Sequence, residues 1–176
     1  MNISNTIADQ TNRALWEVKN VIDCVPDDLW NKLYCDAPMW QHIYHMLHCI
    51  YHMLHSLDRW FINPDIYSEP DFHKLNLNNL DVKPDIELTR DVLNNYYYSI
   101  KNKIIDYIKS LTDDELLSRP TNCQYDKFTL ILAQFRHLHT HMGIIMGFII
   151  SDKGLWPAVL GLQRPIPADD NYEKFC

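Results

Sequence analysis

The chain has 176 residues and a mass of 20.9 kDa, and 47% of its residues are hydrophobic, so we expect one domain over residues 1–176 with a single core. A formal net charge of −7 gives no basic surface for a nucleic acid or an anionic membrane, and we expect neither as a partner. No apolar run approaches the roughly 20 residues that cross a bilayer, and the polar start MNISNTIADQ does not resemble a signal peptide. The sequence therefore predicts a cytoplasmic protein, whose five scattered cysteines we expect to be free thiols.

The scarcity of glycine favours helices over strands. Only four glycines occur in the chain, which leaves few positions for the tight hairpin turns of a many-stranded sheet. We predict an all-α fold, a four-helix bundle in which Asp126 and Gly154 cap the last helix at its two ends. Short capped turns are expected over residues 26–34 and 112–115. The four long helices are predicted over residues 6–24, 38–62, 84–111 and 127–151.

Two segments of the chain do not follow a helical pattern. Residues 63–83 are rich in Asn, Asp and Pro, and they are too long for an ordinary connection between neighbouring antiparallel helices. We expect them to form a crossover between the second and third helices, as a bundle requires when two successive helices are not joined by a tight turn. Residues 151–176 are rich in proline and are expected to form an extended tail that lies over the bundle.

Histidine is the residue type that most needs explanation. Nine histidines are present, and five of them fall within fourteen residues of the second predicted helix. The same stretch contains an internal repeat, because IYHMLHC at residues 43–49 is followed by IYHMLHS at residues 50–56. A heptad advances a helix by nearly two whole turns, so His45 in the first copy and His52 in the second face almost the same way.

Helical periodicity separates these five histidines by direction. Ile43 and Met46 belong to an apolar arc that we expect to face the core, and His45 and His52 flank this arc. These two are therefore the best candidates for inward-facing ligands. The other three are expected to face elsewhere: His48 and His55 towards solvent or a neighbouring helix, and His42 nearer the apolar side at the start of the helix.

The fourth predicted helix carries a second group of histidines. In the sequence FRHLHTHMG, His137 and His141 lie four residues apart on one face, whereas His139 points to roughly the opposite side. Together with a third neutral imidazole, from either His45 or His52, this pair makes a three-histidine metal site with an open position for water or substrate. Imidazole suits zinc, nickel, copper and iron, so the ligand type does not identify the metal. The competing interpretation is that both groups are ordinary core or surface histidines.

Other kinds of metal chemistry are excluded by the residues that are missing. Di-iron bundles use several inward glutamates and paired Glu-x-x-His motifs, whereas this chain has five glutamates and no Glu-x-x-His. The H-E-x-x-H protease motif is also absent, because Leu138 follows His137 where the glutamate base is required.

Two motifs resemble those of DinB-like (DinB/YfiT) proteins: MWQHIYHMLHCIYHMLHSLDRWF in the second helix and LAQFRHLHTHMG in the fourth. The resemblance covers nearly the whole chain. It implies a four-helix bundle that carries a metal on one histidine of the second helix and on an H-x-x-x-H pair of the fourth, which maps onto His137 and His141.

The resemblance leaves the third ligand open between the two heptad copies. Family members of this subtype typically have a Trp five residues before the ligand histidine and an Asp six residues after it. Here the spacing from Trp40 identifies His45 as the ligand. The spacing to Asp58 identifies His52 instead, because the duplicated heptad separates the two parts of the motif. His48 is a weaker third option, since its direction is less favourable.

The resemblance also implies a small-molecule enzyme. Characterised relatives include S-transferases that act with bacillithiol or mycothiol, a thiol-dependent isomerase and metal-dependent hydrolases. We therefore predict that a divalent metal, zinc or nickel, activates water or a low-molecular-weight thiol for attack on a small-molecule substrate, with no catalytic residue assigned. Two alternatives remain: a non-catalytic metal or small-ligand binding protein, and a helical interaction module whose histidines bind nothing. Bundles of this kind often pair through apolar helix faces, so a homodimer is a further expectation.

Overall fold

Helices make up most of the structure, a computed structural model that describes residues 2–57, 69–168 and 172–176, without the side chains of residues 49–57. The described residues contain one small sheet and are otherwise mostly helical, as predicted. The long helices are α1 (Ile3–Cys24), α2 (Met39–Leu57), α3 (Arg90–Ser110) and α5 (Lys127–Lys153). The short elements are the 3-10 helix η1 (Asp27–Leu29), the strands β1 (Leu33–Tyr34) and β2 (Ala37–Pro38), and the helix α4 (Asp113–Leu117).

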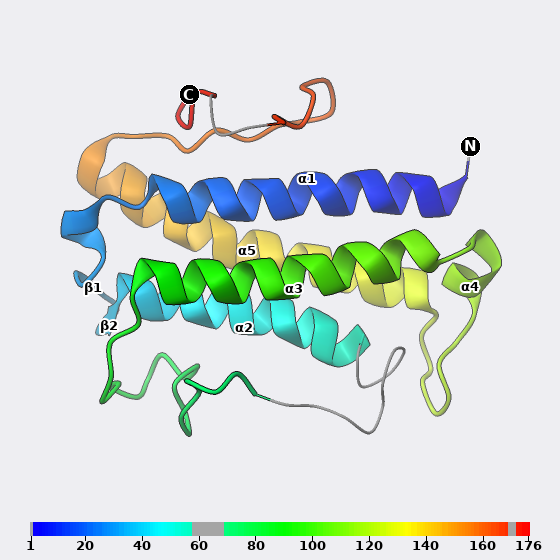
Figure 1. The fold of residues 1–176 in the computed structure, drawn as a ribbon, viewed down its shortest axis with the longest axis horizontal. Coiled ribbons are helices and arrows are strands. Elements are labelled where there is room, and N and C mark those ends of the chain that lie inside the picture. Colours follow the sequence, from blue (N-terminus) through cyan, green and yellow to red (C-terminus); the bar gives the residue numbers. More distant parts are fainter. Residues whose placement is uncertain (1, 58–68, 169–171) are drawn as a thin grey trace.

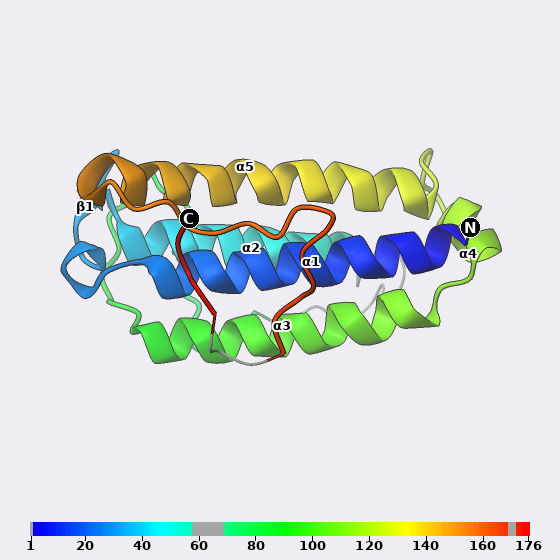
Figure 2. The same cartoon turned by 90° about the horizontal axis from the view of Figure 1, so that it is seen from above.

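The four long helices lie side by side along the length of the molecule (Figures 1 and 2). Helix α1 contacts α3 and α5, and α2 contacts the same two helices, so α1 and α2 occupy opposite corners. Helices α2 and α3 run in the same direction, opposite to α1 and α5 (Figure 1). The chain must therefore return along the molecule between α2 and α3, and we call the described part of this path, residues 69–89, the returning segment. In the described part of the chain, no helix combines the length and apolarity that crossing a membrane requires.

Side-chain caps displace the start of two helices from the predicted positions. Helix α1 begins at residue 3 rather than 6, because the Asn2 side chain accepts a hydrogen bond from the backbone N–H of Ser4 at 2.9 Å. Helix α3 begins at residue 90 rather than 84, because the Thr89 side chain accepts from the N–H of Val92 at 3.3 Å. The predicted end of the second helix, residue 62, lies outside the described residues.

The caps predicted for the later helices are present. Thr112 and Glu115 form a reciprocal capping box at the start of α4. The Asp126 side chain accepts from the N–H of Thr129 at 2.7 Å at the start of α5. Gly154 ends α5 in the left-handed conformation, with φ 68°, and the helix extends two residues past the predicted end, to residue 153.

A short hairpin precedes α2, where the sequence predicted only a turn. Strands β1 and β2 pair antiparallel, with Tyr34 opposite Ala37. Cys35 and Asp36 connect them with φ values of 50° and 66°. Because these two residues adopt the left-handed conformation without being glycine, counting glycines missed the hairpin. Pro38 belongs to β2, so α2 begins one residue later than predicted.

Helix α2 is buried on more than one face. Ile43 and Met46 of the predicted apolar arc have no exposed surface, and the same is true of Tyr44 and Leu47. The reason is that α2 packs against both α3 and α5. It also meets the returning segment, where the Gln41 side-chain amide donates to three backbone carbonyl groups. A single apolar arc therefore underestimates how much of this helix is buried.

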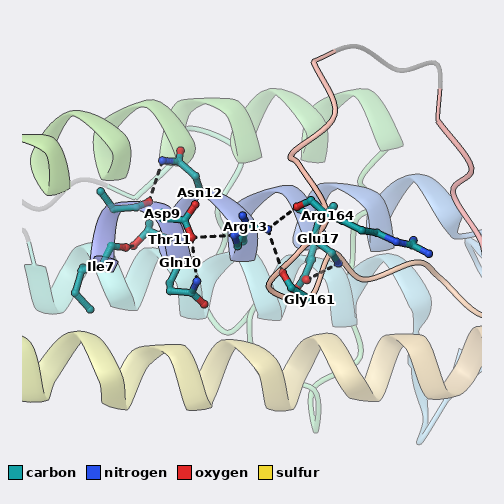
Figure 3. A network of polar contacts seen from close by, with 11 residues as sticks. Ile7, Asp9, Gln10, Thr11, Asn12, Arg13, Glu17, Gly161 and Arg164 are labelled. Carbon is teal, nitrogen blue, oxygen red and sulfur yellow. Dashed lines mark hydrogen bonds and ion pairs between the residues drawn. The ribbon is translucent and has the colours of Figure 1, made fainter. Parts of the chain in front are cut away.

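The tail after α5 crosses over α1 (Figures 1 and 2) and is held by polar side chains of that helix. The Glu17 carboxylate, 8% exposed, accepts a hydrogen bond from the N–H of Leu160 at 2.9 Å. The Arg13 guanidinium donates to the carbonyl groups of Gly161 and Arg164 at 3.1 and 2.7 Å (Figure 3). These contacts fix the extended tail to α1.

Asn20 makes the most buried of these contacts. Its side chain has no exposed surface, and its amide donates to the carbonyl groups of Ala158 and Lys174 at 2.9 and 3.0 Å. The hydroxyl of Tyr172 donates to its side-chain oxygen at 3.2 Å. One asparagine of α1 thus joins two parts of the tail that are separated along the chain.

We predict that Asn20→Ala lowers the free energy of unfolding by about 1–3 kcal/mol, because the carbonyl groups of Ala158 and Lys174 lose this donor inside the protein. Urea denaturation followed by circular dichroism measures the change. Asn5→Ala, on an exposed side chain of the same helix, is the matched control and is expected to change stability by less than about 0.5 kcal/mol. Equal losses in the two variants would contradict this role for Asn20.

Candidate metal centre

His137 and His141 meet on the surface of α5. Helix α5 is fixed at its start by Asp126 and at its end by Gly154, and the two histidines lie one turn apart between these caps. Their rings have centroids 4.6 Å apart, and the two Nε2 atoms are 2.8 Å apart. At this distance one imidazole donates and the other accepts, so both are directed at one point in space.

His45 of α2 lies against this pair. Its ring centroid is 4.6 Å from that of His141, with the rings edge to face. Its Nδ1 is 2.7 Å from the carbonyl oxygen of Asn78 in the returning segment. A carbonyl group only accepts hydrogen bonds, so Nδ1 carries a proton, and in the neutral imidazole Nε2 has the lone pair. The packing of α2 on α5 therefore brings His45 next to His141 of the pair, and we call His45, His137 and His141 the histidine cluster.

The fourth predicted ligand, His52, lies outside the described side chains. His42 is 5% exposed, and its Nε2 donates to the carbonyl oxygen of Tyr34 at 2.8 Å, which fastens the hairpin to α2. His139 lies on another side of α5, where its Nε2 is 3.8 Å from a carboxylate oxygen of Glu17. Neither His42 nor His139 is directed at the histidine cluster by these contacts.

The electrostatic surroundings favour the neutral form of His141. Burial first, and then the neighbouring imidazoles of His45 and His137, together lower the pKa of His141 to about 4. Burial also lowers the pKa of His42, the next histidine along α2. His141 is therefore an unprotonated imidazole at neutral pH, which is the form that binds metal ions.

A second group with metal-binding side chains contains His48 of α2 and Glu69 and His73 of the returning segment. The prediction that His48 points away from the core towards solvent or a neighbouring helix was wrong about solvent, because the residue is 3% exposed. Its Nε2 lies 3.2 Å from Glu69 Oε2. One ligand atom from each of the three residues lies within 4.8 Å of the other two, so the group can hold a metal ion.

Glu69 and His73 are functional candidates that the sequence analysis missed. Both lie within residues 63–83, a stretch whose composition predicts only a connection between helices. A signal was present, because Glu69 precedes His73 by four residues and His73 is the one histidine outside the two histidine-rich helices. The sequence does not show that Glu69 and His73 lie close to His48.

Comparisons with known proteins identify no relative. No family model matches the chain, and neither the curated proteins nor the solved structures contain a match. The resemblance to DinB-like proteins therefore rests on the two histidine motifs, which fall on α2 and α5, and stays a prediction.

We predict that the stability of the metal-free protein falls as the pH drops from about 6.5 towards 4, in part because of His141. Its pKa is lowered in the folded state, so the unfolded chain takes up this proton more readily and acid favours unfolding. Urea denaturation in the presence of EDTA at several pH values measures the slope. His141→Gln should flatten it, whereas His139→Gln, at an exposed position of the same helix, should retain it. An unchanged slope in His141→Gln would refute the prediction.

Proposed function

We propose that this protein is a DinB-like four-helix bundle that binds a divalent metal ion at His45, His137 and His141 and acts on a small-molecule substrate. The observation that carries the proposal is the convergence of the His137 and His141 Nε2 atoms at 2.8 Å, with the His45 ring beside them. The direction of the helices also supports it, because a bundle with a long return between α2 and α3 is the fold that the resemblance implies.

The chain's own residues prepare this site before any ion arrives. Asn78 fixes the ring of His45 through its Nδ1–H, which is how metal-binding histidines are usually oriented. Burial keeps His141 unprotonated, so little free energy is needed to remove a proton on binding. His137 is exposed, so the cluster is accessible from solvent at this residue.

A zinc or nickel ion held by three neutral imidazoles supplies Lewis acidity, which lowers the pKa of a bound water or thiol towards neutrality. The proposed reaction classes are therefore hydrolysis and the transfer of a low-molecular-weight thiol to an electrophile. The protein's part is to position the three ligands and to leave a coordination position open for the reacting molecule.

We predict that the protein purified without an affinity tag contains a divalent metal, and that His137→Ala and His141→Ala each lower its affinity by at least about tenfold. Elemental analysis and competition with a chelator measure the content and the affinity. His139→Ala removes an imidazole from the same helix and should leave both unchanged. His45→Ala should behave like His141→Ala, whereas His52→Ala should retain the metal. A metal content and affinity equal to those of the wild type in both α5 variants would rule out this site.

We predict that the metal-loaded protein transfers low-molecular-weight thiols to electrophiles or hydrolyses simple amides and esters, and that EDTA and His141→Ala abolish the activity. A panel of such substrates, assayed with and without added zinc or nickel, tests this prediction. If the metal is bound stoichiometrically but no substrate reacts, the protein is a metal-binding protein without catalysis. That outcome would reject the enzymatic half of the proposal and keep the metal site.

A further inference from the structure

We propose that His48, Glu69 and His73 form a second divalent-cation site, which fastens the returning segment to α2. The ligand set contains two imidazoles and one carboxylate, and this donor chemistry suits zinc and similar divalent ions of borderline softness. The site shares no ligand with the histidine cluster, so it is separate from the function proposed above.

The three side chains face a common point from two elements. His48 Nε2 on α2 lies 3.2 Å from Glu69 Oε2 and 3.4 Å from Glu69 Oε1. His73 Nε2 lies 4.0 Å from Glu69 Oε1. The His48 and His73 rings are stacked, with centroids 5.4 Å apart and planes 21° apart. The carboxylate therefore lies next to both imidazoles, and small side-chain rotations bring all three within bonding distance of one ion.

Tyr44 holds His73 in this orientation. The Tyr44 hydroxyl lies 2.5 Å from His73 Nδ1, so the ring is fixed through the nitrogen that does not face Glu69. Tyr44 itself has no exposed surface and is packed against Phe72 and Tyr96, with ring centroids 5.8 and 5.9 Å away. A hydrogen bond to the other ring nitrogen is the usual companion of a metal-binding histidine.

Burial distinguishes this group from an ordinary surface ion pair. The side chain of His48 is 4% exposed and that of His73 is 14% exposed, whereas Glu69, at 34%, is the member that reaches solvent. An ion can enter through Glu69 and be held by the two more buried imidazoles. Charge also favours a cation, because Glu69 brings a carboxylate to a site whose other two ligands bind metals as neutral groups.

The consequence of the site is structural. Gln41 on α2 already donates to the carbonyl groups of Leu77, Asn79 and Val82, at 3.1, 3.1 and 3.2 Å. These contacts hold the later part of the returning segment. A cation at Glu69 and His73 would hold its first residues to the same helix, two turns further along α2. Because Asn78 orients His45, a cation bound here also steadies the segment that supports the histidine cluster.

Zinc titration of the metal-free protein, followed by calorimetry, tests the proposal. The wild-type chain should bind about two equivalents, and Glu69→Gln, which preserves the shape of the side chain but weakens it as a ligand, should bind about one. Asp71→Asn removes an exposed carboxylate two residues away and is the matched control, expected to bind about two. His137→Ala should also bind about one equivalent, at the second site.

Hydrogen exchange of residues 69–82 assigns the bound ion to its site. Zinc should slow exchange in this segment in the wild type and in His137→Ala, and should not do so in Glu69→Gln or in His73→Gln. Circular dichroism shows whether each variant is folded, and His73→Gln replaces Glu69→Gln if the latter is not. If Glu69→Gln binds as much zinc as the wild type, or zinc leaves the exchange of this segment unchanged, the second site does not exist. Loss of all zinc in His137→Ala alone overturns the second site and keeps the first.

Discussion

The structure depends on one constraint: α2 is packed on several sides, so each polar side chain that it buries must find a hydrogen-bond partner from another part of the chain. Gln41, His42 and His48 are the buried polar residues described on this helix. The Gln41 amide nitrogen donates to backbone carbonyl groups of the returning segment, and His42 donates to the carbonyl of Tyr34 in the hairpin. His48 meets the carboxylate of Glu69. The hairpin and the returning segment are therefore placed by the same helix that carries His45.

This constraint also explains why two groups of histidines form on one helix. His45 and His48 lie three residues apart, so they face neighbouring directions around α2. In one direction α2 packs on α5, where His137 and His141 are one turn apart. In the other it meets the returning segment, which brings Glu69 and His73. Each group thus combines one histidine of α2 with side chains from another part of the chain. These come from α5 for His45 and from the returning segment for His48.

Local signals in the sequence predicted the parts of the fold that depend on local chemistry. The Thr112 capping box and Asp126 begin their helices and Gly154 ends α5 as predicted, because each cap involves residues within one turn. The proximity of His137 and His141 was predictable for the same reason, since spacing by four residues places them on one face. The predictions that were wrong concern residues whose burial depends on contacts with segments distant in the sequence.

His48 illustrates that failure, and Asn20, for which the sequence made no prediction, is buried for the same physical reason. A periodic arc assumes that a helix has one buried face, but α2 and α1 are each covered on further faces by segments without regular structure. The returning segment buries His48, and the tail buries Asn20 and Glu17, which look like solvent-facing polar residues when the helix is considered alone. The sequence predicted that both segments exist, but it did not contain their paths across the helices.

The duplicated heptad raises the question of which copy provides the α2 ligand. Two copies of IYHMLH present identical histidines at positions seven residues apart, and their backbones along α2 are separated by about 10 Å. The partners are not duplicated: the chain offers one Asn78 carbonyl, one Glu69 and one His137–His141 pair. In the first copy, the imidazoles of His45 and His48 are oriented by hydrogen bonds and neighbouring rings. The contacts described at the first copy are therefore the physical reason for proposing His45 as the α2 ligand.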